Sequence, residues 1–100
     1  MHETALVRDI IRRIDEIARA TNARRVIGAK VWLGALSHLS PDHFRDHFTM
    51  DSRNTPASGA VLEIEVSKDL DDPHAQHVRL ESVDLDEQTY DAAAPWRGWD

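Results

Sequence analysis

The sequence predicts an α+β fold in which two helices pack on one face of a three-stranded mixed sheet, in the order helix, strand, helix, strand, strand. Two segments carry apolar residues at helical spacing, residues 4–21 and 40–50. Three others alternate apolar and polar side chains as half-buried strands do, residues 26–34, 61–66 and 78–85. A chain of 100 residues with 41% hydrophobic residues supports one modest core. We therefore expect a single domain over residues 1–86 and a C-terminal tail over residues 87–100, which show no periodicity.

Residues 4–21 predict an amphipathic helix. One stripe of this helix is apolar and is formed by Leu6, Ile10, Ile14, Ile17 and Ala18. The opposite side carries charges, from Arg8, Arg12, Asp15 and Arg19. Asn22 is predicted to end this helix.

The strand over residues 26–34 has two unlike faces. Its helix-facing side chains are predicted to be Ile27, Ala29, Val31 and Leu33, with Lys30 and Trp32 on the opposite face. A tryptophan on that face leaves two interpretations open. Either the tail folds back and brings Trp96 or Trp99 onto it, or Trp32, Trp96 and Trp99 contact a partner protein.

The second helix has a strong start signal, with Ser40 as N-cap and Pro41 at the first helical position. Phe44 and Phe48 fall four residues apart on its buried side. Because a helix joins the first two strands, we expect these strands to be parallel. The last two strands, joined by residues 67–77 without a helix, should form an antiparallel hairpin. The apolar phase changes at Ser82–Val83, which predicts a bulge there.

Composition excludes several classes of protein. With no cysteine, the sequence can form neither disulfides nor thiolate zinc sites. Its 12 basic and 18 acidic residues give a net charge of −6, which argues against binding nucleic acid. No apolar run approaches the roughly 18–20 residues that cross a bilayer, and the first residues lack a signal-peptide pattern. We expect a cytoplasmic protein that does not bind membranes. No pattern of catalytic residues points to an enzyme.

His2 is the residue with the most chemical information. At position two, the terminal amine of Met1, the backbone nitrogen of His2 and its imidazole Nδ1 can close adjacent chelate rings on one metal ion. The amide of Glu3 can supply a fourth nitrogen. Deprotonated amides favour a square plane, which suits Ni(II) or Cu(II) better than Zn(II). The alternative is that His2 is a terminal residue without a role.

Several motifs resemble the HypA/HybF family of nickel metallochaperones. They are the opening Met1-His2-Glu3, the stretch Gly34-Ala35-Leu36-Ser37-His38-Leu39-Ser40-Pro41, the pair Phe44 and Phe48, and residues 58–65. The resemblance covers residues 1–85. It implies a nickel site at Met1, His2 and Glu3, with nickel(II) as the bound metal. It also implies delivery of nickel to a maturing hydrogenase or urease, alongside a maturation GTPase or the client enzyme subunit as partner.

Two departures from the family pattern stand out. The family carries a four-cysteine zinc ribbon between its last two strands, and here residues 68–76 stand in its place, so no structural zinc is expected. Ser40 stands where some relatives carry a carboxylate near the nickel site. These departures keep a second interpretation open, in which the chain is an adaptor or interaction subunit of an enzyme complex and no longer transfers metal. The sequence makes no prediction of the oligomeric state.

The remaining histidines have two interpretations each. His38 is a candidate outer nickel ligand in the loop before the second helix. His43 and His47 stand four apart on that helix, either as metal ligands or as solvated and partly packed side chains. His74 and His77 form an HxxH motif beside Asp71 and Asp72, which is either a remnant cation site or a polar loop.

Overall fold

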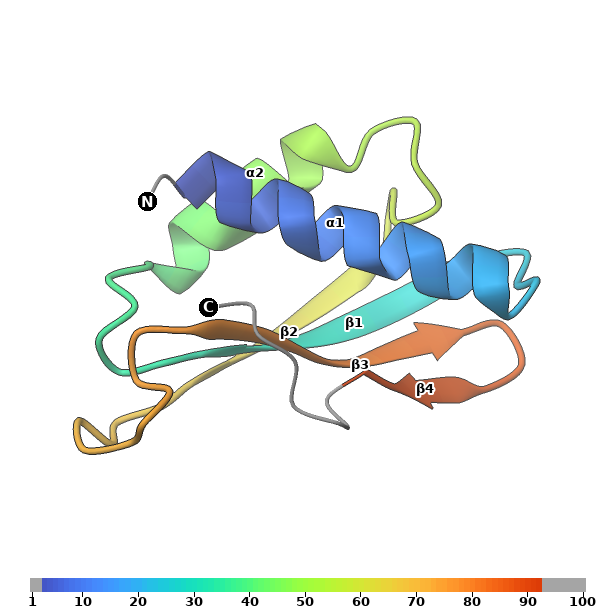
Figure 1. Cartoon of the computed structure of the whole chain (residues 1–100). Coiled ribbons are helices and arrows are strands. Elements are labelled where there is room, and N and C mark those ends of the chain that lie inside the picture. Colours follow the sequence, from blue (N-terminus) through green and yellow to red (C-terminus); the bar gives the residue numbers. More distant parts are fainter. Residues whose placement is uncertain (1–2, 93–100) are drawn as a thin grey trace.

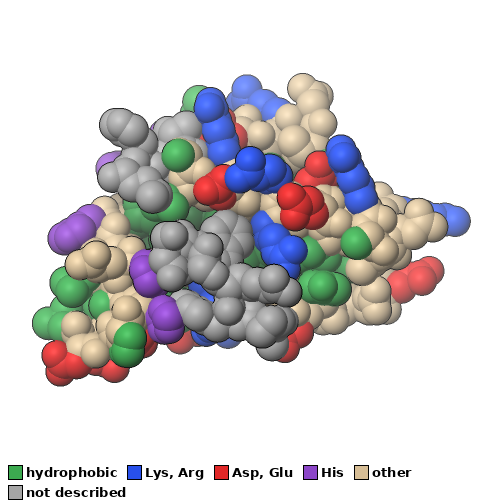
Figure 2. Space-filling view, in the orientation of Figure 1, with side chains coloured by type: hydrophobic (Ala, Val, Ile, Leu, Met, Phe, Trp, Pro, Cys, Tyr) green, Lys and Arg blue, Asp and Glu red, His purple; other side chains and the backbone are tan. Residues whose placement is uncertain are grey.

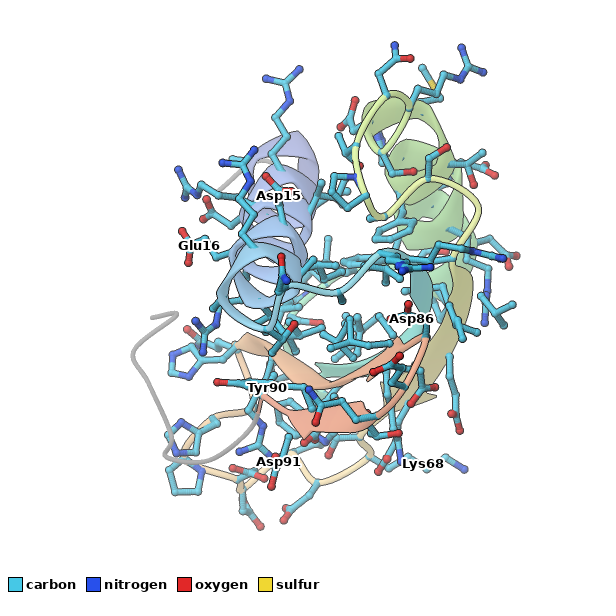
Figure 3. The ribbon with its side chains drawn as sticks, turned by 90° about the vertical axis from the view of Figure 1, so that its right-hand side faces the viewer. Asp15, Glu16, Lys68, Asp86, Tyr90 and Asp91 are labelled. Atoms are coloured by element: carbon cyan, nitrogen blue, oxygen red, sulfur yellow. The ribbon has the colours of Figure 1, made fainter. Side chains whose placement is uncertain are left out.

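Two helices cover one face of a four-stranded sheet. The computed structural model describes residues 3–92, and its elements are α1 (Glu3–Ala20), β1 (Val26–Leu33), α2 (Pro41–Asp51), β2 (Val61–Val66), β3 (Val78–Leu85) and β4 (Thr89–Asp91). Figure 1 shows the helices lying above the sheet, and Figure 3 shows them side by side when the molecule is viewed from its end. The predicted α+β class with two helices on one face is confirmed, with one more strand than predicted.

The core lies between the helices and the sheet. From α1 it takes the buried side chains of Val7, Ile10, Ile11, Ile14, Ile17 and Ala18. Phe44 and Phe48 are its contribution from α2, as the four-residue spacing predicted. α1 packs over β1 and β3, and α2 packs over β2. The burial of these apolar faces is the main term that stabilises the two layers against each other.

The sheet order is β2-β1-β3-β4. β1 and β2 are parallel, as predicted from the helix between them. The predicted hairpin of β2 and β3 is wrong, because β1 lies between these strands and pairs antiparallel with β3. Neighbouring strands are about 4.8 Å apart, so β3 lies about 10 Å from β2. The connection over residues 67–77 crosses that distance, which accounts for a length unusual in a hairpin loop.

The fourth strand, β4, falls inside the predicted tail. Its pairs with β3 are Ser82↔Asp91, Val83↔Tyr90 and Asp84↔Thr89. Three residues are too few for an alternating pattern to stand out, and the turn before β4 lacks the glycine and asparagine of common hairpin turns. The prediction that residues 87–100 have no regular structure is therefore corrected at residues 89–91.

Two irregularities set which side chains of β1 and β3 face the core. The pairing of β1 with β3 skips Ile27, between Val26 and Gly28, so the side-chain phase changes there. Val26 is buried as a result and Ile27 is 46% exposed, which corrects the prediction that Ile27 faces the helices. A second shift skips Glu81, beside the bulge predicted at Ser82–Val83.

Candidate metal site

Histidines gather at one end of the molecule. Figure 2 shows their side chains at the left of the face in view, and in Figure 1 α1 and α2 begin at this end. The parallel strands β1 and β2 also have their carboxyl ends at this end of the molecule, and the connection over residues 67–77 lies at the same end. Ligand sites of open sheets with parallel strands form at the carboxyl ends of those strands. This end is therefore where a site for a small ligand or ion is expected.

The predicted nickel ligands stand at the start of α1. Met1 and His2 lie outside the described residues, and Glu3 is the first residue of α1. The first N–H groups of a helix have no acceptor within that helix. The amide nitrogen of Glu3 therefore makes no hydrogen bond within α1, and the helix leaves it available to another partner.

Three of the predicted histidines stand on or before α2. His38 is exposed and has a left-handed backbone, with φ of 59°, in the loop that leads to Ser40. Ser40 has the extended backbone of an N-cap, with φ −83° and ψ 132°, but its hydroxyl makes no capping hydrogen bond. His43 is exposed in the first turn of α2, whereas His47 is half-buried. Within residues 3–92, no three side chains of His, Asp or Glu come together as a metal-binding group.

His74 and His77 are brought together in the connection between β2 and β3. Their Nδ1 atoms lie 3.2 Å apart, and their ring centroids are 5.3 Å apart with the planes tilted by 46°. The spacing of two residues between them was visible in the sequence. The distance between the rings could not be predicted from the sequence, because it depends on the turns that fold residues 72–77.

Trp32 lies on the sheet face opposite the helices, as the alternation predicted, and is half-buried. Its partner across the ladder is Arg79, whose guanidinium carbon lies 5.8 Å from the centre of the indole ring. Arg79 also donates to Glu81 at 3.1 Å, and Lys30 pairs with Glu65 at 3.5 Å. This face therefore carries cation–π and ionic contacts around Trp32. Trp96 and Trp99, the other predicted contact residues, lie outside the described residues.

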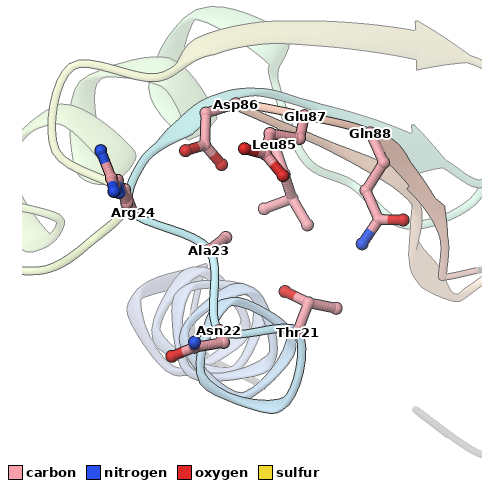
Figure 4. Close-up of a pocket in the computed structure, with 8 residues that line it drawn as sticks. All are labelled: Thr21, Asn22, Ala23, Arg24, Leu85, Asp86, Glu87 and Gln88. Carbon is pink, nitrogen blue, oxygen red and sulfur yellow. The ribbon is translucent and has the colours of Figure 1, made fainter.

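A pocket is present at the opposite end of the molecule, between the end of α1 and the turn from β3 to β4 (Figure 4). It contains none of the predicted metal-ligating or partner-contacting residues, and its lining is mostly polar: Thr21, Asn22, Ala23, Arg24, Leu85, Asp86, Glu87 and Gln88. The candidate metal site and this pocket are therefore separate features. Among the described residues, no helix has both the length and the apolar character needed to span a membrane.

Comparison with known proteins identifies the fold first. The chain resembles the solution structure of the Ni metallochaperone HypA from Helicobacter pylori with a TM-score of 0.74 and 18% identity. The match covers 85% of this chain and 97% of that one. A second solution structure of a HypA protein gives a TM-score of 0.67, again at 18% identity, over 85% of this chain and 96% of the other. The arrangement of helices and sheet is therefore the α+β fold of these two solved structures.

Sequence comparison then identifies the family. The family described as "Hydrogenase/urease nickel incorporation, metallochaperone, hypA" matches residues 1–70. Hydrogenase maturation factor HypA 1 of Bradyrhizobium diazoefficiens is 38% identical, over 64% of this chain and 57% of that protein. Hydrogenase maturation factor HypA of Archaeoglobus fulgidus is 34% identical, over 68% of this chain and 62% of that protein. The chain belongs to the HypA family. It spans about half to three fifths of the length of the relatives it matches.

Proposed function

We propose that this chain is a nickel-binding accessory protein in the maturation of a nickel enzyme. Its metal site is formed by the amine of Met1, the imidazole and amide nitrogen of His2, and the amide nitrogen of Glu3. The observation that carries the proposal is the family match over residues 1–70, which includes these three residues. The proposed client is a hydrogenase or a urease, and the proposed partners are a maturation GTPase and the client enzyme subunit.

The start of α1 at Glu3 supports this geometry. An amide nitrogen within a helix is bonded to the carbonyl oxygen four residues earlier, but the amide of Glu3 has no such acceptor. It can therefore lose its proton to a metal without breaking the helix. The positive end of the α1 dipole disfavours a nearby cation, and the negative charge of deprotonated amides offsets this effect.

The proposal concerns binding and transfer, and it assigns no catalytic step to the chain. Four nitrogens in a plane bind Ni(II) more strongly than Zn(II), whose preferred geometry is tetrahedral. The absence of cysteine in the sequence rules out a four-cysteine zinc site within these residues, so no structural zinc is part of the proposal. Nickel is the cargo of the protein.

Titration of Ni(II) into protein produced with Met1 as its first residue, without a tag, tests the site. We expect one equivalent to bind with the visible absorption band of square-planar Ni(II). His2→Ala should abolish this band, and a Gly-Ser extension before Met1 should abolish it with His2 intact. His43→Gln is the matched control, because it removes an exposed histidine of α2 and should leave the band unchanged.

The outcomes separate the two interpretations of the chain. An extended protein that keeps the band would contradict the role of the free amine. Protein that never develops the band, yet co-purifies with an enzyme subunit at fixed stoichiometry, would favour the adaptor function over nickel transfer.

A further inference from the structure

The HxxH motif of the β2–β3 connection has the geometry of a bidentate metal ligand. The Nδ1 atoms of His74 and His77 lie 3.2 Å apart. Two nitrogens that are each about 2.0–2.1 Å from one zinc ion are about 3.3 Å apart at the tetrahedral angle and about 2.9 Å apart at a right angle. The observed separation falls between these values. The two nitrogens therefore have the spacing that one bound cation requires.

The backbone around the two histidines is fixed by hydrogen bonds within the connection. The N–H of His74 donates to Oδ1 of Asp72 at 2.8 Å, and the N–H of Ala75 donates to the carbonyl of Asp72 at 2.9 Å. The N–H of His77 donates to the carbonyl of His74, also at 2.9 Å. These bonds form two consecutive turns, and the second turn brings residues three apart onto one side. The three-residue spacing of the motif matches this turn, and the two imidazoles therefore lie on the same side of it.

The same segment is tied to the end of β1. The N–H of Gly34 donates to the carbonyl of His77 at 2.9 Å, and the N–H of Leu36 donates to the carbonyl of Ala75 at 2.7 Å. Ala75 itself is buried, at 4% exposure. The segment that carries the two imidazoles is therefore hydrogen-bonded to the end of β1 at Ala75, which lies between the histidines, and at His77 itself. A ligand pair held in this way loses less conformational entropy on binding a metal than one on a free loop.

We propose that His74 and His77 form a second metal site, which binds one divalent transition cation of the Zn(II) and Ni(II) class through their two Nδ1 atoms. Imidazole suits both metals. Water is proposed to supply the other ligands, since among the described residues the pair is not part of a group of three or more His, Asp or Glu side chains that could hold a metal. Three aspartates at positions 69, 71 and 72 give this segment a negative field that favours a cation. The proposal does not depend on the nickel site at His2.

Without metal, the short contact between the two rings is a hydrogen bond, in which one Nδ1 carries the proton and the other accepts it. A metal bound to both Nδ1 atoms needs both lone pairs. The Nδ1 proton must therefore leave, and each ring then carries its proton on Nε2. Metal binding thus changes the tautomer of one histidine, a change that a hydrogen-bonded pair without metal does not make.

The test uses the full chain with His2→Ala, so that the proposed nickel site contributes nothing. Zn(II) and Ni(II) are each titrated in separate calorimetric experiments at neutral pH. We expect one equivalent of at least one of the two metals to bind. His74→Gln or His77→Gln should weaken that binding about tenfold or more, because a chelate loses its second contact. His43→Gln is the matched control: it removes an exposed imidazole that is not part of the His74–His77 pair, and it should change the affinity less than about twofold.

A second measurement needs no variant of the pair. Nitrogen-15 NMR of the histidine rings should show both Nδ1 atoms of residues 74 and 77 shifted by the bound metal. The proposal is overturned if the His2→Ala chain binds neither Zn(II) nor Ni(II). It is also overturned by a loss of affinity in His43→Gln as large as that in His77→Gln, or by a metal shift confined to histidines other than His74 and His77. Failure here leaves the square-planar band of the unmodified chain unaffected, so the two sites are tested separately.

Discussion

Gly34 lies directly against the carbonyl group of Ala75: a Cβ placed on Gly34 would be 2.2 Å from the oxygen of Ala75. Real Cβ atoms do not approach a carbonyl oxygen so closely, so any side chain at residue 34 must displace the backbone of the β2–β3 connection. The same carbonyl accepts a hydrogen bond from Leu36. The close approach and the hydrogen bond together fix where the connection crosses the end of β1.

Gly34→Ala should therefore destabilise the protein by about 1–3 kcal/mol, the cost of forcing extra atoms into a packed site. Urea denaturation followed by circular dichroism measures the change. Gln76→Ala is the control, because this exposed residue of the same connection should change the free energy of unfolding by less than about 0.5 kcal/mol. Equal stability of the two variants would contradict the close approach.

The end of α1 gives a second prediction. Asn22 has a left-handed backbone with φ of 56°, its N–H donates to the carbonyl of Arg19, and the N–H of Ala23 donates to the carbonyl of Ala18. These bonds form a Schellman cap. Asn22→Val should cost about 1–2 kcal/mol, since a β-branched side chain clashes in this conformation. Asn22→Gly, which has no such clash, should be at least as stable as the parent by thermal melting.

Phe44 is the largest side chain that the core buries completely. Phe44→Ala should lower the free energy of unfolding by about 3–5 kcal/mol, because it removes buried apolar area and leaves a cavity between α2 and the sheet. Met50→Ala on the same helix serves as control. Met50 is 60% exposed, so its truncation should fall within about 0.5 kcal/mol of the parent in the same urea titration.

Nickel binding at the proposed amino-terminal site should depend on pH. The imidazole of His2 must be unprotonated to bind, and the reference pKa of imidazole is about 6.5. Binding also releases the protons of the amide ligands. The affinity for Ni(II) should therefore be high above about pH 7 and fall steeply as the pH drops through about 6.5. Titration of tag-free protein across this range measures the effect, and an affinity that rises on acidification would contradict the ligand set.

Local signals in the sequence were sufficient to predict the two helices. Ser40 and Pro41 mark the start of α2, Phe44 marks its buried side, and Asn22 marks the end of α1. Each of these signals depends only on residues within one or two helical turns of it. The parallel pairing of β1 with β2 was also predicted, because a helical connection leaves little choice of direction.

Features that depend on distant parts of the chain were not predictable in this way. Ile27 is exposed because β1 bulges against β3, about 60 residues away in the sequence. β3 pairs with β1, although chain order favours β2 as its neighbour. The approach of His74 to His77 likewise requires turns whose carbonyls are bonded to the segment after β1.

The β2–β3 connection crosses at the end of β1, so the length of this connection does not affect how the strands of the sheet pair. β1 sets the register of both its neighbours, whereas residues 67–77 only have to reach from β2 on one side of β1 to β3 on the other. Additional residues inserted there would extend from the carboxyl ends of β1 and β2, next to the histidine-rich end. They would leave every residue pair between neighbouring strands unchanged. Segments of quite different size and chemistry can therefore be exchanged at this place while the remainder of the domain keeps its shape.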